Sequence, residues 1–316
     1  MKNSICAICL LAILIVGCGK NEPPVNPDIK YGKNKFSTVV DGIEREYFVS
    51  VPKNYDGKTA VPVVFMLHGT GGDGEKFYNI SGWKEVGDQE NILTVFPSAL
   101  SRCIIEEGET KTISKWNSLP AANFYYCAKV TPPDDVKFFK TIIDEITEKY
   151  KIDSKRIYFV GFSNGGQMCA KLSMEMGDKI AAIVESAAAF RMDTTFVPVR
   201  KMPVTFQLGN GDYGPGKEGP FIPLSNLSSM LSFPGPQPYA TTQTYIKSFD
   251  LNPNYTISGD TDTVVIATYL PNEVNANYEY NFALIKDLAH LYPNGANHLL
   301  YGARINWAWL KNYTLP

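Results

Sequence analysis

Short apolar runs of strand length alternate along the chain with segments of helical periodicity. Residues 61–67, 92–96 and 157–160 are nearly all apolar, which is typical of strands covered on both faces of a sheet. Two alternating runs flank Asp41 and Gly42 and predict a β-hairpin with a type I′ turn. Further strands are expected at residues 180–184, 202–208, 263–269 and 278–285, and helices at residues 75–86, 134–150, 164–176, 241–249 and 301–313. This order predicts an α/β fold, with a mostly parallel, doubly wound sheet and helices on both faces.

The N-terminus reads as a targeting segment. Lys2 precedes an apolar run that ends at Val16, Gly17 and Cys18, and this end resembles the lipobox of bacterial lipoproteins. We therefore expect a signal peptide at residues 1–17, a lipidated Cys18, a Pro- and Asn-rich tether at residues 18–34 and one catalytic domain at residues 35–316. A plain secretory signal with a chance cysteine is the alternative. The lipoprotein interpretation predicts export and anchoring to the cell envelope, with membrane contact only through Cys18.

The remaining cysteines indicate one disulfide. Residues 98–131 are polar and irregular, so we expect a loop insertion there, tied by a bond between Cys103 and Cys127. Cys169 falls on the helix after residue 163 and is expected to be a buried free thiol. Residues 214–238 are rich in Gly, Pro and Ser and predict a surface loop or lid. The net charge of −2 gives no electrostatic reason to expect a nucleic acid partner, and no residue spacing is typical of a metal site.

The stretch Gly161-Phe162-Ser163-Asn164-Gly165 lies between an apolar run and a helical run. A Gly-x-Ser-x-Gly turn between a strand and a helix is the nucleophile elbow of the α/β-hydrolases, which exposes the serine hydroxyl at the end of the sheet. Glycines two residues either side of the serine let the strand and the helix approach closely. Ser163 is thus the candidate nucleophile.

The partners of such a serine follow it in the order acid, then histidine. His290 and His298 both follow the last predicted strand, and we favour His290 because it lies nearer the strand end. Asp212 follows a predicted strand end and is the candidate acid, with Asp287 as its rival. The alternative is that Asp212 only stabilises the turn Gly209-Asn-Gly-Asp212, where aspartate is a favoured residue.

Two backbone amides are candidates for an oxyanion hole. The N–H of Asn164 stands at the start of a helix, where the helix dipole favours negative charge. A second donor is expected from the segment His68-Gly-Thr-Gly-Gly72, with the Thr70 N–H as the candidate. His68 itself is expected to be structural.

These motifs together resemble the esterases of the polyhydroxybutyrate-depolymerase and feruloyl-esterase type, including carbohydrate esterase family 1. The resemblance covers residues 42–313 and is carried by the segments Leu67–Gly72, Ser81–Trp83, Asp134–Val136, Val160–Gly166, Gly209–Asp212 and His290–Pro293. It implies Ser163 as nucleophile, Asp212 as acid, His290 as base, and oxyanion donors at Thr70 and Asn164. Two departures stand out: Tyr292 occupies a place where the family has Trp, and residues 213–223 are longer and richer in Gly.

The expected activity is that of a serine carboxyl-ester hydrolase that forms an acyl-enzyme. The resemblance implies feruloyl or acetyl esters of plant polysaccharide, or small esters, as substrates, with no cofactor. Trp116, Tyr126 and Tyr292 are candidates to contact the substrate, and packing is the alternative role for these aromatic residues. Other possible functions are a polyhydroxyalkanoate depolymerase, a lipase or a peptidase on the same triad, or a non-catalytic glycan-binding lipoprotein.

Overall fold

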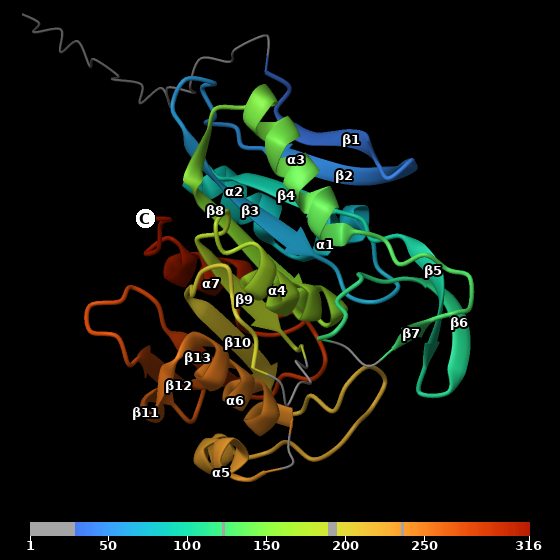
Figure 1. Ribbon diagram of the computed structural model, residues 1–316. Helices are drawn as coiled ribbons and strands as arrows, with labels where there is room; N and C mark the ends of the chain where they lie inside the picture. Colours follow the sequence, from blue (N-terminus) through green and yellow to red (C-terminus); the bar gives the residue numbers. More distant parts are fainter. Residues whose placement is uncertain (1–28, 122–123, 189–194, 235–236) are drawn as a thin grey trace, which may run out of the picture.

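The computed structural model describes residues 29–121, 124–188, 195–234 and 237–316. Within them, one ten-stranded sheet forms the centre of the molecule, and a separate three-stranded sheet projects from one side (Figure 1). The order in the large sheet is β1 (Gly32–Val40), β2 (Ile43–Val51), β4 (Leu93–Pro97), β3 (Val61–Leu67), β8 (Ile152–Phe162), β9 (Ala182–Ser186), β10 (Val204–Gly209), β13 (Tyr280–Ile285), β12 (Val264–Pro271) and β11 (Leu251–Asp260).

The six central strands, from β4 to β13, are mutually parallel, and antiparallel hairpins extend the sheet at both edges. Strands β3 and β9 are buried along their whole length, as expected for strands that have a helical layer on either side. The prediction of a mostly parallel, doubly wound sheet is therefore confirmed. All carboxyl ends of the parallel strands meet at one edge, which is where ligands collect in such sheets.

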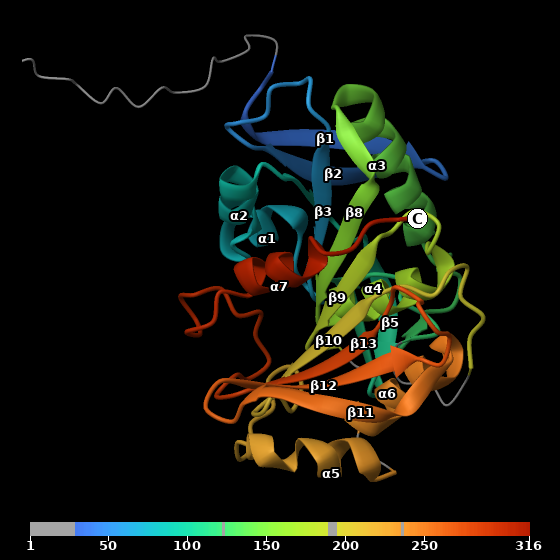
Figure 2. The same ribbon diagram turned by 90° about the vertical axis from the view of Figure 1, so that its left-hand side faces the viewer.

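Helices cover both faces of this sheet, as Figure 2 shows. One face carries α1 (Gly74–Ile80), α2 (Trp83–Glu90) and α7 (Gly302–Leu310), and the other carries α3 (Asp135–Lys149), α4 (Asn164–Glu175) and α6 (Gln237–Phe249). A short helix, α5 (Leu227–Ser232), packs against α6. Helix α3 begins where the sequence predicts, because the Asp134 side chain accepts a hydrogen bond from the Lys137 N–H at 2.8 Å. No described helix is long and apolar enough to cross a membrane.

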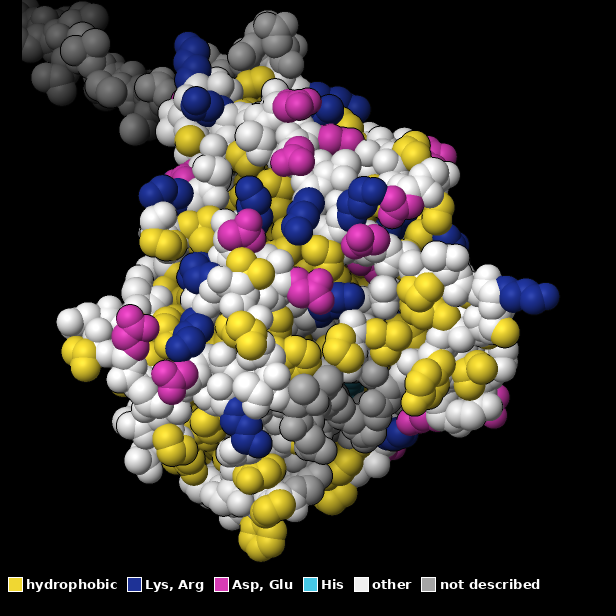
Figure 3. All heavy atoms as spheres, in the orientation of Figure 1, with side chains coloured by type: hydrophobic (Ala, Val, Ile, Leu, Met, Phe, Trp, Pro, Cys, Tyr) yellow, Lys and Arg dark blue, Asp and Glu magenta, His cyan; other side chains and the backbone are white. Residues whose placement is uncertain are grey.

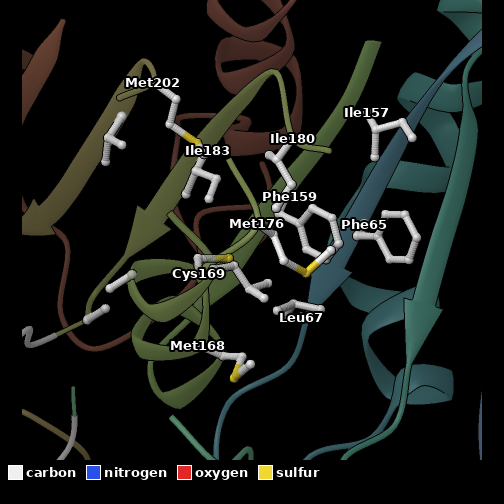
Figure 4. Packing of buried hydrophobic residues seen from close by; sticks show 14 of the residues in the cluster. Phe65, Leu67, Ile157, Phe159, Met168, Cys169, Met176, Ile180, Ile183 and Met202 are labelled. Carbon is white, nitrogen blue, oxygen red and sulfur yellow. The ribbon is translucent and has the colours of Figure 1, made fainter. Parts of the chain in front are cut away.

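The larger core lies between the sheet and the layer formed by α3, α4 and α6 (Figure 4). Phe65 of β3 stacks on Phe159 of β8 with ring centroids 4.3 Å apart, and Phe139 of α3 meets Phe159 edge-on. Cys169 of α4 is a buried free thiol in this cluster, which confirms its expected state. Burying a side chain as large as Phe159 stabilises the fold by about 2–3 kcal/mol.

The insertion after β4 is more regular than the sequence predicts. Its three strands are β5 (Ser101–Glu106), β6 (Glu109–Ser114) and β7 (Tyr125–Tyr126), in the order β6-β5-β7. Glu107 and Gly108 form the turn between β5 and β6, and both have positive φ values, of 52° and 82°. A disulfide joins Cys103 to Cys127, and the Cys127 N–H donates to the Cys103 carbonyl at 3.1 Å. The insertion is thus a small disulfide-tied sheet.

Two other expectations need correction, and one strand of the large sheet was not expected. The tether cannot run to residue 34, because β1 begins at Gly32 and Asn34 is buried, with its side chain bonded to the Lys30 and Gly32 carbonyls. The single helix expected at residues 75–86 is two helices, α1 and α2, separated at residues 81–82. Strand β11 was not predicted, because most of its side chains are exposed and polar and so lack a strand's apolar alternation.

One carboxyl group lies deep inside the core. Glu185 of β9 is fully buried and accepts a hydrogen bond from the Tyr245 hydroxyl of α6. Its second oxygen, Oε2, has no partner among the described residues. Burial raises the pKa of the Glu185 carboxyl to about 8, although the Tyr245 hydrogen bond acts in the opposite direction. The group is therefore protonated in the folded protein at neutral pH.

Removing the disulfide should destabilise the protein without altering its large sheet. The bond joins residues separated by 24 positions, and closing a loop of that length stabilises by about 3 kcal/mol in the chain-entropy model. We expect the double variant Cys103→Ala/Cys127→Ala to lose roughly that free energy of unfolding, measured by urea titration. Adding reductant to the wild type should reproduce the shift, and an unchanged unfolding midpoint would contradict the expectation.

Glu185 should make stability fall as the pH rises. The pKa of its carboxyl is 4.5 in the ordinary state and about 8 when folded, so the folded protein retains a proton that the unfolded chain releases. The stabilisation is complete below pH 4.5 and is lost as the pH rises through about 8. We expect urea unfolding to show this loss relative to Glu185→Gln, which does not titrate. Parallel pH profiles for the two proteins would contradict it.

Candidate active site

Ser163 occupies the sharp turn between β8 and α4. Its backbone has φ 54° and ψ −121°, a conformation that side chains disfavour, and its N–H donates to the Ser186 carbonyl of β9 at 2.8 Å. The two glycines of the motif are required by close approach: a Cβ at Gly161 would lie 2.1 Å from the Gly165 carbonyl oxygen, and one at Gly165 would lie 2.5 Å from the Leu67 carbonyl oxygen. The turn has the strand–turn–helix context that the elbow motif needs.

The structure brings Ser163, His290 and Asp212 into one hydrogen-bonded chain. His290 Nε2 lies 3.0 Å from Ser163 Oγ, and His290 Nδ1 lies 2.9 Å from Asp212 Oδ1. The imidazole Nδ1–H therefore donates to the carboxylate, and Nε2 is left to accept the serine proton. The Asp212 carboxylate is almost fully buried, whereas 14% of the His290 side chain is exposed. Asp212 Oδ1 also accepts the Gly214 N–H at 2.9 Å, which fixes the carboxylate.

The loops that carry Asp212 and His290 are fastened to each other. They follow β10 and β13, which are parallel neighbours in the sheet. The Gly211 N–H donates to the Leu288 carbonyl at 3.0 Å, and the Asn210 N–H donates to the Ile285 carbonyl at 2.8 Å. Leu288 crosses so close to Gly209 that a Cβ there would lie 2.0 Å from the Leu288 carbonyl oxygen. The acid and the histidine are thus positioned as a unit.

The other two described histidines have structural partners. His298 Nε2–H donates to the Lys286 carbonyl at 2.8 Å, and its Nδ1 accepts the Leu300 N–H at 3.1 Å. His68 is fully buried, with Nδ1–H donating to the Gly69 carbonyl and Nε2 accepting the Ala99 N–H. Burial lowers the pKa of His68 to about 4, so its imidazole is neutral. Asp287, the rival acid, is exposed.

The two expected oxyanion donors belong to two turns that meet beside the serine. Asn164 is the first residue of α4, and Thr70 belongs to the turn between β3 and α1. This turn lies against the elbow, because a Cβ at Gly69 would come within 3.1 Å of Ser163 Cβ. No described residue accepts a hydrogen bond from the N–H of Thr70 or of Asn164. Both amides thus remain candidates for the oxyanion hole.

Two of the three aromatic residues expected to contact the substrate are instead buried in the core. The Trp116 side chain is fully buried, and its indole N–H donates to the His68 carbonyl at 2.9 Å. Tyr292 is 5% exposed, and its hydroxyl accepts hydrogen bonds from Trp83 and Asn306. Both side chains sit in the core because their polar atoms find partners there.

The third residue, Tyr126, is partly buried and packs edge-on against Phe124. Its neighbour Tyr125 points to the other face of β7 and is 75% exposed. The sequence does not single out Tyr125, because no alternation marks the two-residue strand β7 within the polar insertion. Exposed hydrophobic side chains gather on the lobe that this insertion forms (Figure 3).

Residues 54–210, about half of the chain, match the family model described as phospholipase/carboxylesterase. This segment therefore resembles the phospholipase/carboxylesterase family. It contains the glycine-rich turn and Ser163, whereas His290 lies beyond it. The match supports hydrolysis of carboxylic esters.

Two curated relatives are also esterases by name. A putative esterase NocK of Nocardia uniformis subsp. tsuyamanensis is 25% identical over 195 residues, which cover 60% of this chain and 50% of the relative. Feruloyl esterase B of Piromyces equi is 28% identical over 143 residues, 45% of this chain and 24% of the relative. The chain thus spans half or less of the length of these relatives.

Solved structures show the same fold at low identity. An acetyl xylan esterase from Aspergillus awamori superposes with a TM-score of 0.54 and 12% identity, over 88% of this chain and 99% of that one. A thermostable esterase gives a TM-score of 0.52 and 16% identity, over 89% of this chain and 63% of that one. These likenesses establish the α/β-hydrolase fold.

Proposed function

We propose that this protein is a serine carboxyl-ester hydrolase with Ser163 as nucleophile, His290 as base and Asp212 as acid. The observation that carries the proposal is the continuous hydrogen-bonded chain from Asp212 through His290 to Ser163 Oγ, at a strained strand-to-helix turn. A serine hydroxyl is a weak nucleophile unless an adjacent base takes its proton, and this arrangement supplies the base and orients it.

The geometry supports the following steps for the proposed reaction. His290 Nε2 takes the proton from Ser163 Oγ as the oxygen attacks the ester carbonyl carbon, and Asp212 stabilises the imidazolium. The N–H groups of Thr70 and Asn164 donate to the oxyanion, each contributing about 3 kcal/mol to the stabilisation of the transition state. The carbon–oxygen bond then breaks, and the alcohol leaves with the proton from His290. Water, deprotonated by His290, attacks the acyl-enzyme and releases the acid.

We propose feruloyl or acetyl esters of plant polysaccharide as the substrates. Support comes from the names of the relatives, which include feruloyl esterases and a bifunctional acetylxylan esterase/xylanase. The exposed ring of Tyr125, on the insertion that packs beside the glycine-rich turn, offers a surface for sugar or ferulate. Basic and acidic side chains are interspersed on the face in Figure 3, which suits a neutral polymer better than a nucleic acid.

We also propose that the protein is exported and anchored through a lipid on Cys18. The support is the sequence pattern alone, since residues 1–28 lie outside the described part of the chain. The chain enters the fold at β1, an edge strand, whereas Ser163 follows the central strand β8. An anchor on that side would leave the ester site accessible to polymer. Metabolic labelling with a palmitate analogue, compared between wild type and Cys18→Ser, tests this directly.

The catalytic assignments predict a sharp contrast between two histidines. Ser163→Ala and His290→Ala should each lower kcat on a chromogenic acetate by about 10⁴-fold or more. His298→Ala should retain activity within about tenfold, because that side chain bonds only the backbone of Lys286 and Leu300 and neither Ser163 nor Asp212. Loss of activity in His298→Ala, with His290→Ala still active, would refute the assignment of the base.

A fluorophosphonate probe followed by peptide mass spectrometry should label Ser163 in the wild type and lose that label in His290→Ala. An unlabelled wild-type protein would instead indicate a glycan-binding lipoprotein without catalysis.

To define the substrate, the purified protein should be assayed on methyl ferulate, acetylated xylan, hydroxybutyrate oligomers and long-chain p-nitrophenyl esters. We expect the first two to be preferred, and a preference for hydroxybutyrate oligomers or long acyl chains would mark a depolymerase or a lipase.

A further inference from the structure

The two oxyanion donors come from separate parts of the fold. Thr70 follows β3, and Asn164 begins α4, more than ninety residues later in the chain. Hydrogen-bond donors stabilise an oxyanion only when their separation and direction are held to within about 0.5 Å. Some contact must therefore fix the distance between the two turns. The two turns pack directly on each other, and both are also hydrogen-bonded to one short segment, Ser114–Ser118, which we call the brace.

The brace is bonded to the glycine-rich turn at three points. The Gly71 N–H donates to the Ser114 carbonyl at 2.9 Å, and the Ser114 hydroxyl donates to the Gly72 carbonyl at 2.7 Å. The indole N–H of Trp116 donates to the His68 carbonyl at 2.9 Å. These bonds lie on both sides of Thr70 in sequence. They fix the path of the backbone through the candidate donor.

The same segment is bonded to the side chain of Asn164. The Trp116 N–H donates to Asn164 Oδ1 at 2.7 Å, and Asn164 Nδ2 donates to the Ser118 hydroxyl at 3.0 Å. The Asn164 side chain is 2% exposed and faces the brace, whereas its backbone N–H is the second candidate donor. One residue thus joins the start of α4 to the segment that holds the other donor.

The brace is also hydrogen-bonded to residues outside the two turns, on α3 and α4. The Asn117 N–H donates to Asp135 Oδ2 at 2.6 Å, and Asp135 Oδ1 forms a fully buried ion pair with Arg45 of β2 at 2.6 Å. Lys171 of α4 donates to the Asn117 carbonyl at 3.1 Å. A buried charge pair of this kind keeps its geometry because breaking it would leave a desolvated charge. The brace is therefore tied to the sheet, to α3 and to α4.

We propose that Asn164 and Trp116 are positioning residues, whose side chains act through the brace to hold the Thr70 and Asn164 amides at the spacing that a tetrahedral oxyanion requires. This inference rests on the proposed esterase activity and extends it. Neither side chain touches the substrate. Their effect falls on the transition state, in which the oxyanion forms, and not on ester binding.

Three variants test the proposal, and the conservative one is Trp116→Phe, which removes the indole N–H and keeps a buried ring. Asn164→Ala removes the side-chain bonds but keeps the backbone donor, and Ser114→Ala removes one bond at a partly exposed position. We expect kcat to fall by about tenfold to a hundredfold in Trp116→Phe and Asn164→Ala, with KM within about twofold. Ser114→Ala should show a smaller fall of the same kind.

A tetrahedral inhibitor provides the readout that a purely structural role would not affect. The inhibition constant of an aryl trifluoromethyl ketone, which forms an oxyanion on the serine, should rise across the variants by the factor by which kcat/KM falls. Trp307→Phe is the matched control. Trp307 of α7 is also buried, and its indole N–H donates to Glu90 Oε2 of α2 at 2.9 Å. This control should lower the melting temperature as much as Trp116→Phe and leave both constants unchanged.

The outcomes separate the two proposals. A wild type that neither hydrolyses esters nor labels at Ser163 overturns the esterase and, with it, the positioning role. An active wild type whose folded Trp116→Phe and Ser114→Ala variants keep kcat/KM and inhibitor affinity within twofold overturns the positioning role alone. A fall in activity in Trp307→Phe equal to that in Trp116→Phe also overturns it, because general destabilisation then accounts for both.

Discussion

The geometry of the candidate active site depends on a strained backbone conformation at Ser163. A left-handed φ at a serine costs of order 1–3 kcal/mol and persists only where the surroundings over-determine it. Here the N–H is bonded to β9, the flanking glycines allow the helix and neighbouring strands to press against the turn, and α4 begins at the next residue. The large sheet provides the rigid frame that keeps the hydroxyl at its exposed edge.

The candidate acid and base lie at the same edge of the sheet as the serine. Asp212 and His290 lie 78 residues apart in sequence, yet their loops follow adjacent parallel strands and share backbone hydrogen bonds. Tyr292, two residues after the histidine, anchors its loop to Trp83 of α2 and Asn306 of α7. A substitution at Trp83 or Asn306 can therefore reach the site through this one hydroxyl, without contact with the serine.

Local sequence signals predicted the parts of the fold that have strong patterns of their own. The elbow, the Asp41-Gly42 hairpin, the N-cap of α3 and the cysteine pair are each encoded within a few residues or by composition. The sheet in the insertion was missed, because Glu109–Ser114 is polar on both faces and only the Glu107-Gly108 pair signals its turn. The burial of Trp116 could not be predicted, since the partner of its indole is a carbonyl 48 residues away. The choice between His290 and His298 likewise needed the spatial positions of the loops.

Strand β11 forms one free edge of the large sheet, and its composition has a consequence for how copies of the protein behave when crowded. An unpaired edge is a template for strand addition by another chain. This one carries Asn252, Pro253, Asn254 and Asp260, most of its side chains face solvent, and its pairing with β12 is irregular between Leu251 and Tyr255. Proline lacks the N–H that an incoming strand would need. This edge of the sheet is therefore a poor template for strand addition by another copy of the protein.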